Sequence, residues 1–226
     1  MQEKQHVPFG FVQSALPWFV AAGALITYLV TLVPWLSLSN IAFVAKVTAL
    51  DGTPPLSAPL FFLLTYPIRV LPDSVQPWCL NAFAAVCAAL TLALLTRSVA
   101  LLPHDRTHDQ RLRERSDYSY LSIPLAWLPP LFAALVCGLQ LTFWEHSISA
   151  TGESLNLLLF AYVIRCLLEL RIDGNEAWLK RFALVYGLGV ANNWAMIGFL
   201  PCFVVALVWI RGFSLFQFRS FLAILL

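Results

Sequence analysis

The chain has 226 residues, of which 60% are hydrophobic and 12% are charged, and its formal net charge is +2. A soluble domain usually has about a quarter of its residues charged, so this composition excludes an ordinary water-exposed surface. It predicts an all-α integral membrane protein, a polytopic helix bundle, and the small net charge gives no indication of a nucleic-acid partner.

Long hydrophobic runs occur along the whole chain. A helix needs about 20 residues to cross the roughly 30 Å hydrocarbon core of a bilayer. Largely uncharged segments of that length predict spans at residues 17–38, 77–97 and 121–144. A fourth predicted span, 153–170, carries Arg165 and Glu169 only in its last turns, where they can pair at i, i+4 and reach the membrane interface.

The sequence between residues 182 and 210 is uncharged but is too long for one simple span. As a single helix it would extend about 44 Å, which exceeds the hydrocarbon core. Several small or helix-breaking residues interrupt it: Gly187, Gly189, Asn192, Asn193 and Pro201. We expect two shorter helices, 182–192 and 194–210, that meet at Asn192 and Asn193 and are buried against neighbours. One kinked and tilted span is the alternative.

A last apolar segment, 213–226, predicts the start of a further span. We therefore expect residues 1–226 to form a single transmembrane domain with about six or seven spans. We also expect this domain to be the N-terminal part of a longer protein.

Orientation follows from the basic residues. Five arginines lie between residues 97 and 115, and Arg171, Lys180 and Arg181 follow later. Because loops rich in Lys and Arg stay in the cytoplasm, we predict cytoplasmic loops at 98–120 and 171–181 and a cytoplasmic N-terminus. The first apolar stretch is too long for a cleaved signal peptide and predicts an uncleaved signal anchor.

Two loops then lie on the far side of the membrane, at 39–76 and 145–152. Within the first, residues 57–72 are apolar and too short to span, which predicts an interfacial or re-entrant helix. Ionisable groups are costly in membrane proteins and are functional candidates, although each alone is also typical of a solvated helix cap. The far-side candidates are Lys46, Asp51, Arg69, Asp73, Glu145, His146 and Glu153.

No strong metal or nucleophile motif accompanies them. His104, Asp105, His108 and Asp109 have the spacing of half a metal site, but the neighbouring arginines favour a solvated charged loop. The sequence has no phosphate-binding Gly loop, nucleophile elbow or HExxH motif. The cysteines lie in apolar runs without CxxC spacing, which predicts small buried hydrophobes: Cys79, Cys87, Cys137, Cys166 and Cys202.

Several short patterns fall in one order along the chain. A Pro-Pro segment at Pro54 and Pro55 follows the first predicted span, and an aromatic pair, Phe143 and Trp144, precedes Glu153 and an apolar helix. A segment from 187 to 193 then leads to Pro201. These features resemble the bacterial family called domain of unknown function 2723. That family is similar to the transmembrane protein 260 O-mannosyltransferases and belongs among the GT-C membrane glycosyltransferases.

The resemblance implies a GT-C-like bundle in the bacterial inner membrane. Such an enzyme transfers a sugar, with inversion, from a polyprenyl-phosphate donor to an acceptor on the non-cytoplasmic face. The reaction needs a carboxylate base and a cation beside the departing phosphate. It implies no resident cofactor other than an optional divalent cation.

For this chemistry, the predicted side of the membrane and the loop in which each residue lies suggest individual roles. Asp51 is the expected base, with Glu153 as a base or positioning group, and Lys46 or Arg69 at the phosphate. The other expected substrate-binding residues flank them in the sequence: Glu145, His146, Asn192 and Asn193.

One departure from the family pattern matters. Family members carry an acidic Asp-Ser-Gly-Glu-like motif after the first helix, whereas residues 38–41 read Leu-Ser-Asn-Ile, and an Asn pair stands where a His is often found. Asp51 can substitute only if its loop bends back toward the membrane. The alternatives are therefore an inactive homologue or a non-catalytic transporter or scaffold, since interrupted helices also bind substrates in transporters.

Overall fold

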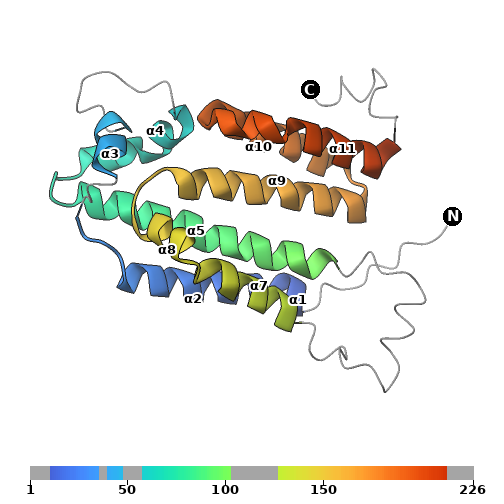
Figure 1. The fold of residues 1–226 in the computed structure, drawn as a ribbon, viewed down its shortest axis with the longest axis horizontal. Helices are drawn as coiled ribbons and strands as arrows, with labels where there is room; N and C mark the ends of the chain where they lie inside the picture. The colour runs from blue at the N-terminus through green and yellow to red at the C-terminus, as the bar shows by residue number, and fades with distance from the viewer. Residues whose placement is uncertain (1–10, 36–39, 48–57, 103–126, 213–226) are drawn as a thin grey trace.

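A computed structural model describes residues 11–35, 40–47, 58–102 and 127–212, and every regular element in these residues is a helix (Figure 1). Asp51, the cluster from His104 to Asp109 and the predicted span 213–226 lie outside the described residues. The elements are α1 (Phe11–Ser14), α2 (Leu16–Val30), α3 (Ile41–Val47), α4 (Pro59–Thr65), η1 (Tyr66–Val70), α5 (Gln76–Leu101), α7 (Leu128–Gly138), α8 (Leu141–Ile148), α9 (Glu153–Asp173), α10 (Glu176–Asn192), η4 (Trp194–Phe199) and α11 (Leu200–Arg211).

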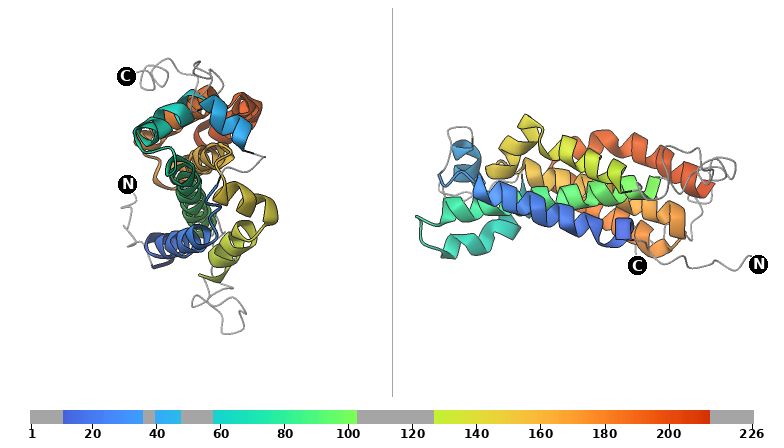
Figure 2. Two further views of the ribbon diagram at one scale, coloured as in Figure 1. Left: turned by 90° about the vertical axis from the view of Figure 1, so that its left-hand side faces the viewer. Right: turned by 90° about the horizontal axis from the view of Figure 1, so that it is seen from below.

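The central helix of the bundle is α5. It contacts α2 on one side and α9 on the other, while α10 packs on the outer side of α9 (Figure 1). Small residues such as Ala85 and Ala88 are almost fully buried on α5, and small side chains let neighbouring helices approach closely. The long helices run roughly along one direction, and α3 and α4 lie at one end of the bundle (Figure 2).

Among the residues that the structure describes, two helical segments are long and apolar enough to cross a membrane: α5 and the continuous stretch Trp194–Arg211. The pair α7 and α8 qualifies only if it counts as one span, and the two helices are bent by 71°. The described ranges thus contain two to three candidate spans, and the six or seven that we predict are not shown. One reason is the charge carried by α9, which includes Arg165, Glu169 and Arg171.

Several boundaries differ from the prediction, and the first is that of the expected span 17–38, because α2 ends at Val30. The expected span 121–144 is not one straight helix within its described part, since α7 ends at Gly138 and α8 begins at Leu141. The expected loop 171–181 is mostly helical. Gly174 ends α9 at φ 64°, and the side chain of Asn175 accepts a hydrogen bond from the Ala177 amide at the start of α10. A Gly in the left-handed conformation and an Asn cap join the two helices by a tight turn. The basic residues predicted the side of the membrane but gave no indication of this turn.

The helix is interrupted at Asn193, where the sequence predicts a break. Asn193 is extended, with φ −143° and ψ 116°, and its side chain caps η4 by accepting from the Ala195 amide at 2.9 Å. The Asn193 amide still donates to the Gly189 carbonyl at 2.8 Å. The break therefore leaves these backbone groups satisfied, as the interior of a membrane protein requires.

Glu169 has a partner that the i, i+4 prediction does not include. It is buried between α5 and α9, where Nε and Nη2 of Arg97 each lie 2.7 Å from its Oε1. The predicted i, i+4 pair exists as well, but the distance from Arg165 Nε to the same oxygen is 3.5 Å. The stronger partner comes from another helix.

All five cysteines are free thiols. Cys87 and Cys166 are buried, as predicted, and Cys79 and Cys137 are half-buried. Cys202 differs from the prediction because it is exposed on α11.

Candidate functional site

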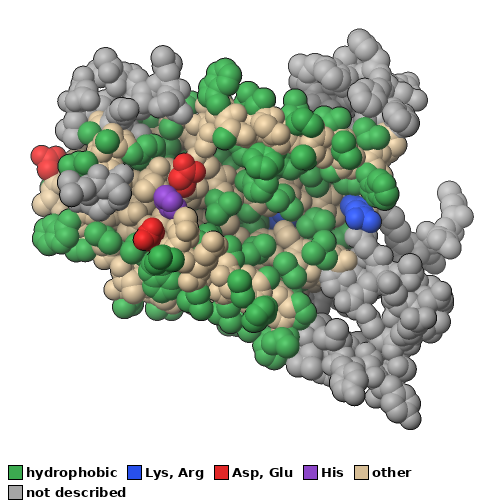
Figure 3. Space-filling model, in the orientation of Figure 1, with side chains coloured by type: hydrophobic (Ala, Val, Ile, Leu, Met, Phe, Trp, Pro, Cys, Tyr) green, Lys and Arg blue, Asp and Glu red, His purple; other side chains and the backbone are tan. Residues whose placement is uncertain are grey.

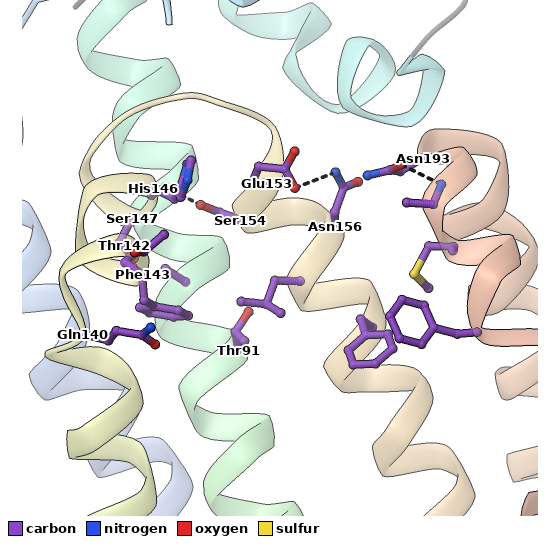
Figure 4. A pocket seen from close by; sticks show the side chains of 16 residues that line it. Thr91, Gln140, Thr142, Phe143, His146, Ser147, Glu153, Ser154, Asn156 and Asn193 are labelled. Atoms are coloured by element: carbon purple, nitrogen blue, oxygen red, sulfur yellow. Dashed lines mark hydrogen bonds between the residues drawn. The ribbon is translucent and has the colours of Figure 1, made fainter. Parts of the chain in front are cut away.

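A cavity of about 410 Å³ opens between α5, α8, α9 and η4. Its polar lining includes His146, Glu153, Asn156 and Asn193, which follow one another along one rim in Figure 4. The remaining wall is mainly apolar and includes Phe143, Leu157, Phe160, Met196 and Phe199. The cavity thus joins a polar rim to an apolar wall.

Glu153 is the first residue of α9, and the preceding residue, Gly152, determines where the helix begins. Gly152 has φ 80°, and a Cβ there would clash with Cζ of Phe43 in α3. Only glycine combines this backbone conformation with so close a contact. The exposed Glu153 carboxylate sits at a helix N-terminus, which favours a negative charge.

Asn156 links Glu153 to the broken helix. Its Nδ2 lies 3.5 Å from Glu153 Oε2, and its Oδ1 accepts a 2.7 Å hydrogen bond from Nδ2 of Asn192. Asn192 in turn accepts from the Phe61 amide of α4 at 3.0 Å. This chain of amides connects α9, α10 and α4.

His146 is held by the loop between α8 and α9. Its Nδ1 lies 2.8 Å from the hydroxyl of Thr151, and its backbone carbonyl accepts from the hydroxyl of Ser154. These contacts orient the ring at the rim. Its Nε2 has no hydrogen-bond partner among the residues that the structure describes.

Some of the predicted site residues line the cavity and others do not. His146, Glu153 and Asn193 line the cavity, whereas Asn192 is buried and bonded to other helices. Glu145 is exposed on α8 next to His146 and does not line the cavity. The only histidine within the described ranges lies between acidic side chains on the face shown in Figure 3.

Arg69, one of the two predicted cationic residues, is not among the residues that line the cavity. Arg69 lies in η1, with its guanidinium carbon 4.2 Å from the ring centre of Phe62 and 5.7 Å from that of Tyr66. Lys46 lies in α3, one helical turn after Phe43, which contacts Gly152.

Sequence reasoning missed two asparagines near this end of the bundle. Asn81 of α5 is fully buried; it donates to the Val33 carbonyl at 2.7 Å and accepts from the Ala150 amide at 2.8 Å. An amide within an apolar span was the available signal, because such a group must find a partner. Asn40 is also fully buried, and neither of its side-chain polar atoms has a partner among the described residues.

Within the described part of the chain, no three His, Cys, Asp or Glu side chains come together in a way that could hold a metal ion. The cavity itself offers His146 and Glu153. We therefore assign no step to the optional divalent cation.

Residues 42–214 match the family described as Protein O-mannosyl-transferase TMEM260 N-terminal domain. The chain belongs to this family. No curated protein and no solved structure matches the chain.

Membership of the TMEM260 N-terminal domain family makes this a membrane protein related to glycosyltransferases, and the candidate spans agree with that assignment. All eight predicted site residues, from Lys46 to Asn193, lie within the matched segment. The match supports the O-mannosyltransferase part of the resemblance. The assignments to domain of unknown function 2723 and to the GT-C class stay predictions.

Proposed function

We propose that this TMEM260 domain transfers a sugar from a polyprenyl-phosphate donor to an acceptor on the non-cytoplasmic face of the membrane. The observation that supports this most is the cavity beside Glu153, which joins a polar rim to an apolar wall. A lipid-linked sugar has the same two parts. Its sugar and phosphate match the rim, and its polyprenyl chain matches the wall formed by Phe160, Met196 and Phe199.

The proposed reaction is an inverting displacement. A carboxylate takes the proton from the acceptor hydroxyl, the acceptor oxygen attacks the anomeric carbon, and the bond from that carbon to the phosphate oxygen breaks. Polyprenyl phosphate leaves. Glu153 is exposed at the rim and suits the base, while the amide groups of Asn156 and Asn193 and the ring of His146 suit hydrogen bonds to the sugar.

Asp51, the base expected from the sequence, is the other candidate. The segment 48–57 that contains it joins α3 to α4, and these helices contact one another through Phe43 and Phe61, whose ring centres lie 5.2 Å apart. Phe43 also contacts Gly152, the residue before Glu153. One anchor of the Asp51 segment, α3, therefore adjoins Glu153, and the other, α4, packs against α3, which supports a shared site. Lys46, on α3, is the preferred cation for the departing phosphate, with Arg69 the alternative.

Reconstitution with polyprenyl-phosphate mannose and an acceptor peptide tests the proposal. Loss of a general base typically lowers the rate about 100-fold or more. We expect Glu153→Gln or Asp51→Asn to show that loss, and Glu176→Gln, a matched exposed carboxylate at the first residue of α10 and outside the cavity lining, to keep near wild-type transfer. Undiminished transfer in both Glu153→Gln and Asp51→Asn would remove the assignment.

A non-catalytic transporter or scaffold is the alternative. Asn193, at the break between α10 and η4, lines the cavity, and transporters bind substrates at such breaks. The family's acidic motif is also replaced around Asn40. Saturable binding of the lipid-linked sugar without any transfer by the wild-type chain would favour this second function.

A further inference from the structure

A second groove, of about 450 Å³, lies between α1, α2, α5, α9 and α10. Two guanidinium groups line it, those of Arg97 and Arg165, and no Asp or Glu is among its described lining residues. Most of the remaining wall is apolar and includes Trp18, Leu90 and Leu158. The groove is therefore cationic in one part and hydrophobic along the rest.

The Glu169 carboxylate lies beside both arginines. Glu169 lies 2.7 Å from two nitrogens of Arg97, but its distance from Arg165 Nε is 3.5 Å. Glu169 is the only polar partner of Arg165 among the described residues, and the buried Arg165 Nε makes no hydrogen bond to them. Arg165 therefore retains donors for an anion. A guanidinium fork suits phosphate oxygens.

The positions of these groups fit a lipid. At 1.5 Å per residue, Arg97 lies about 13 Å from the midpoint of α5. With that midpoint at the centre of the bilayer, Arg97 is close to the edge of the hydrocarbon core, whose half-thickness is about 15 Å. From Arg97 to Leu90 and from Arg165 to Leu158, the lined faces of α5 and α9 run about 10 Å toward the opposite end of the bundle. A phosphate at the arginines would place an acyl chain along these faces.

We propose that this groove binds one anionic phospholipid, with its phosphodiester against Arg165 and Arg97 and an acyl chain along α5 and α9. Basic pockets between membrane helices on the cytoplasmic side bind anionic headgroups. Arg97 and Arg165 lie toward the ends of α5 and α9 that lead into the basic segments predicted to be cytoplasmic. The site is distinct from the Glu153 cavity, since the two share no lining residue.

Lipid retention by the purified full chain, measured by native mass spectrometry, tests the proposal. We expect phosphatidylglycerol to be retained at least fivefold over phosphatidylcholine, and Arg165→Met to lower that retention at least fivefold. Arg181→Met is the matched control, because Arg181 lies 4.6 Å from the Trp178 ring, which Arg165 also approaches at 5.6 Å, but does not line the groove. It should retain the lipid normally.

A second variant separates lipid binding from folding and from binding of a free anion. Leu158→Trp fills the apolar wall while keeping both arginines, and we expect it to lose phosphatidylglycerol as well. Inorganic phosphate and glycerol phosphate should compete poorly. Equal retention of phosphatidylcholine, normal retention by Leu158→Trp, normal retention by a folded Arg165→Met, or full competition by inorganic phosphate would each overturn the proposal.

Discussion

Arg97 of α5 holds the buried carboxylate of Glu169 in α9, with two guanidinium nitrogens at 2.7 Å from one carboxylate oxygen. The same guanidinium donates through Nη1 to the Gln13 carbonyl of α1 at 2.6 Å. One side chain therefore joins three helices at this end of the bundle. Its partner has no access to water, since the Glu169 side chain is only 2% exposed.

We expect Glu169→Gln to destabilise the domain strongly. Removing one member of a buried ion pair leaves an uncompensated charge and costs about 3–5 kcal/mol. Glu176→Gln is the matched control: this carboxylate is 65% exposed and lies 3.3 Å from Arg211, and an exposed pair is worth at most about 1 kcal/mol. Thermal unfolding in detergent measures both. Equal shifts in the unfolding temperatures of the two variants would show that the buried pair contributes no more to stability than the exposed pair.

Asn192 should matter more for stability than its neighbour. Asn192→Ala leaves the Phe61 amide of α4 and the Asn156 side chain without their bonds, and an unsatisfied buried group costs about 1–3 kcal/mol. Asn193→Ala removes a helix cap, worth about 1 kcal/mol, and a cavity-lining amide. We expect lower unfolding temperatures for Asn192→Ala and weaker donor binding for Asn193→Ala. The reverse pattern would contradict the roles assigned here.

Two glycine substitutions should change the stability of the domain in opposite directions. Gly152→Ala meets Phe43 and a backbone at φ 80°, so we expect it to lower stability and to displace the start of α9. Gly187→Ala lies within α10 with nothing within 4 Å of the added carbon, so it should stabilise the helix by about 0.5–1 kcal/mol. Unfolding temperatures of the two variants give the comparison. Stabilisation by Gly152→Ala would mean that α3 does not pack there.

The helix break shows what a sequence pattern can predict. Asn192 and Asn193 interrupt an uncharged stretch too long for one span, and the structure interrupts the helix at that point. Local chemistry decides this feature, because an asparagine side chain can replace a backbone hydrogen-bond partner at a helix start. Glu153 and His146 were also identifiable from their position around a short loop, and both line one cavity.

Features that depend on distant residues were not predictable. Glu169 lies 72 positions from Arg97, so its burial could not follow from the i, i+4 spacing with Arg165. The bend between α7 and α8 falls between Gly138 and Leu141, where neither charge nor proline marks it and only Gly138 and Gln140 interrupt the apolar run. Arg69 was assigned to the site by its side of the membrane alone, yet it stacks on Phe62 away from the cavity lining.

The two ends of α9 should face opposite compartments. This helix has 21 residues and is about 30 Å long, close to the thickness of the hydrocarbon core. In a background without the native cysteines, we expect Glu153→Cys and Asp51→Cys to react with an impermeant maleimide in intact cells. Glu176→Cys should react only after permeabilisation. If positions 51 and 153 reacted from different sides, they could not form one site.

The central claim is that a lipid-linked sugar occupies the cavity beside Glu153, and photocrosslinking tests it most directly. Phe160, which lines the cavity, and Phe132, which is exposed on α7 and does not line it, are each replaced by p-benzoylphenylalanine. With a radiolabelled polyprenyl-phosphate mannose, we expect crosslinking at position 160 that excess unlabelled donor abolishes, and only weak, uncompeted crosslinking at position 132. Equal and uncompeted crosslinking at both positions would contradict the account.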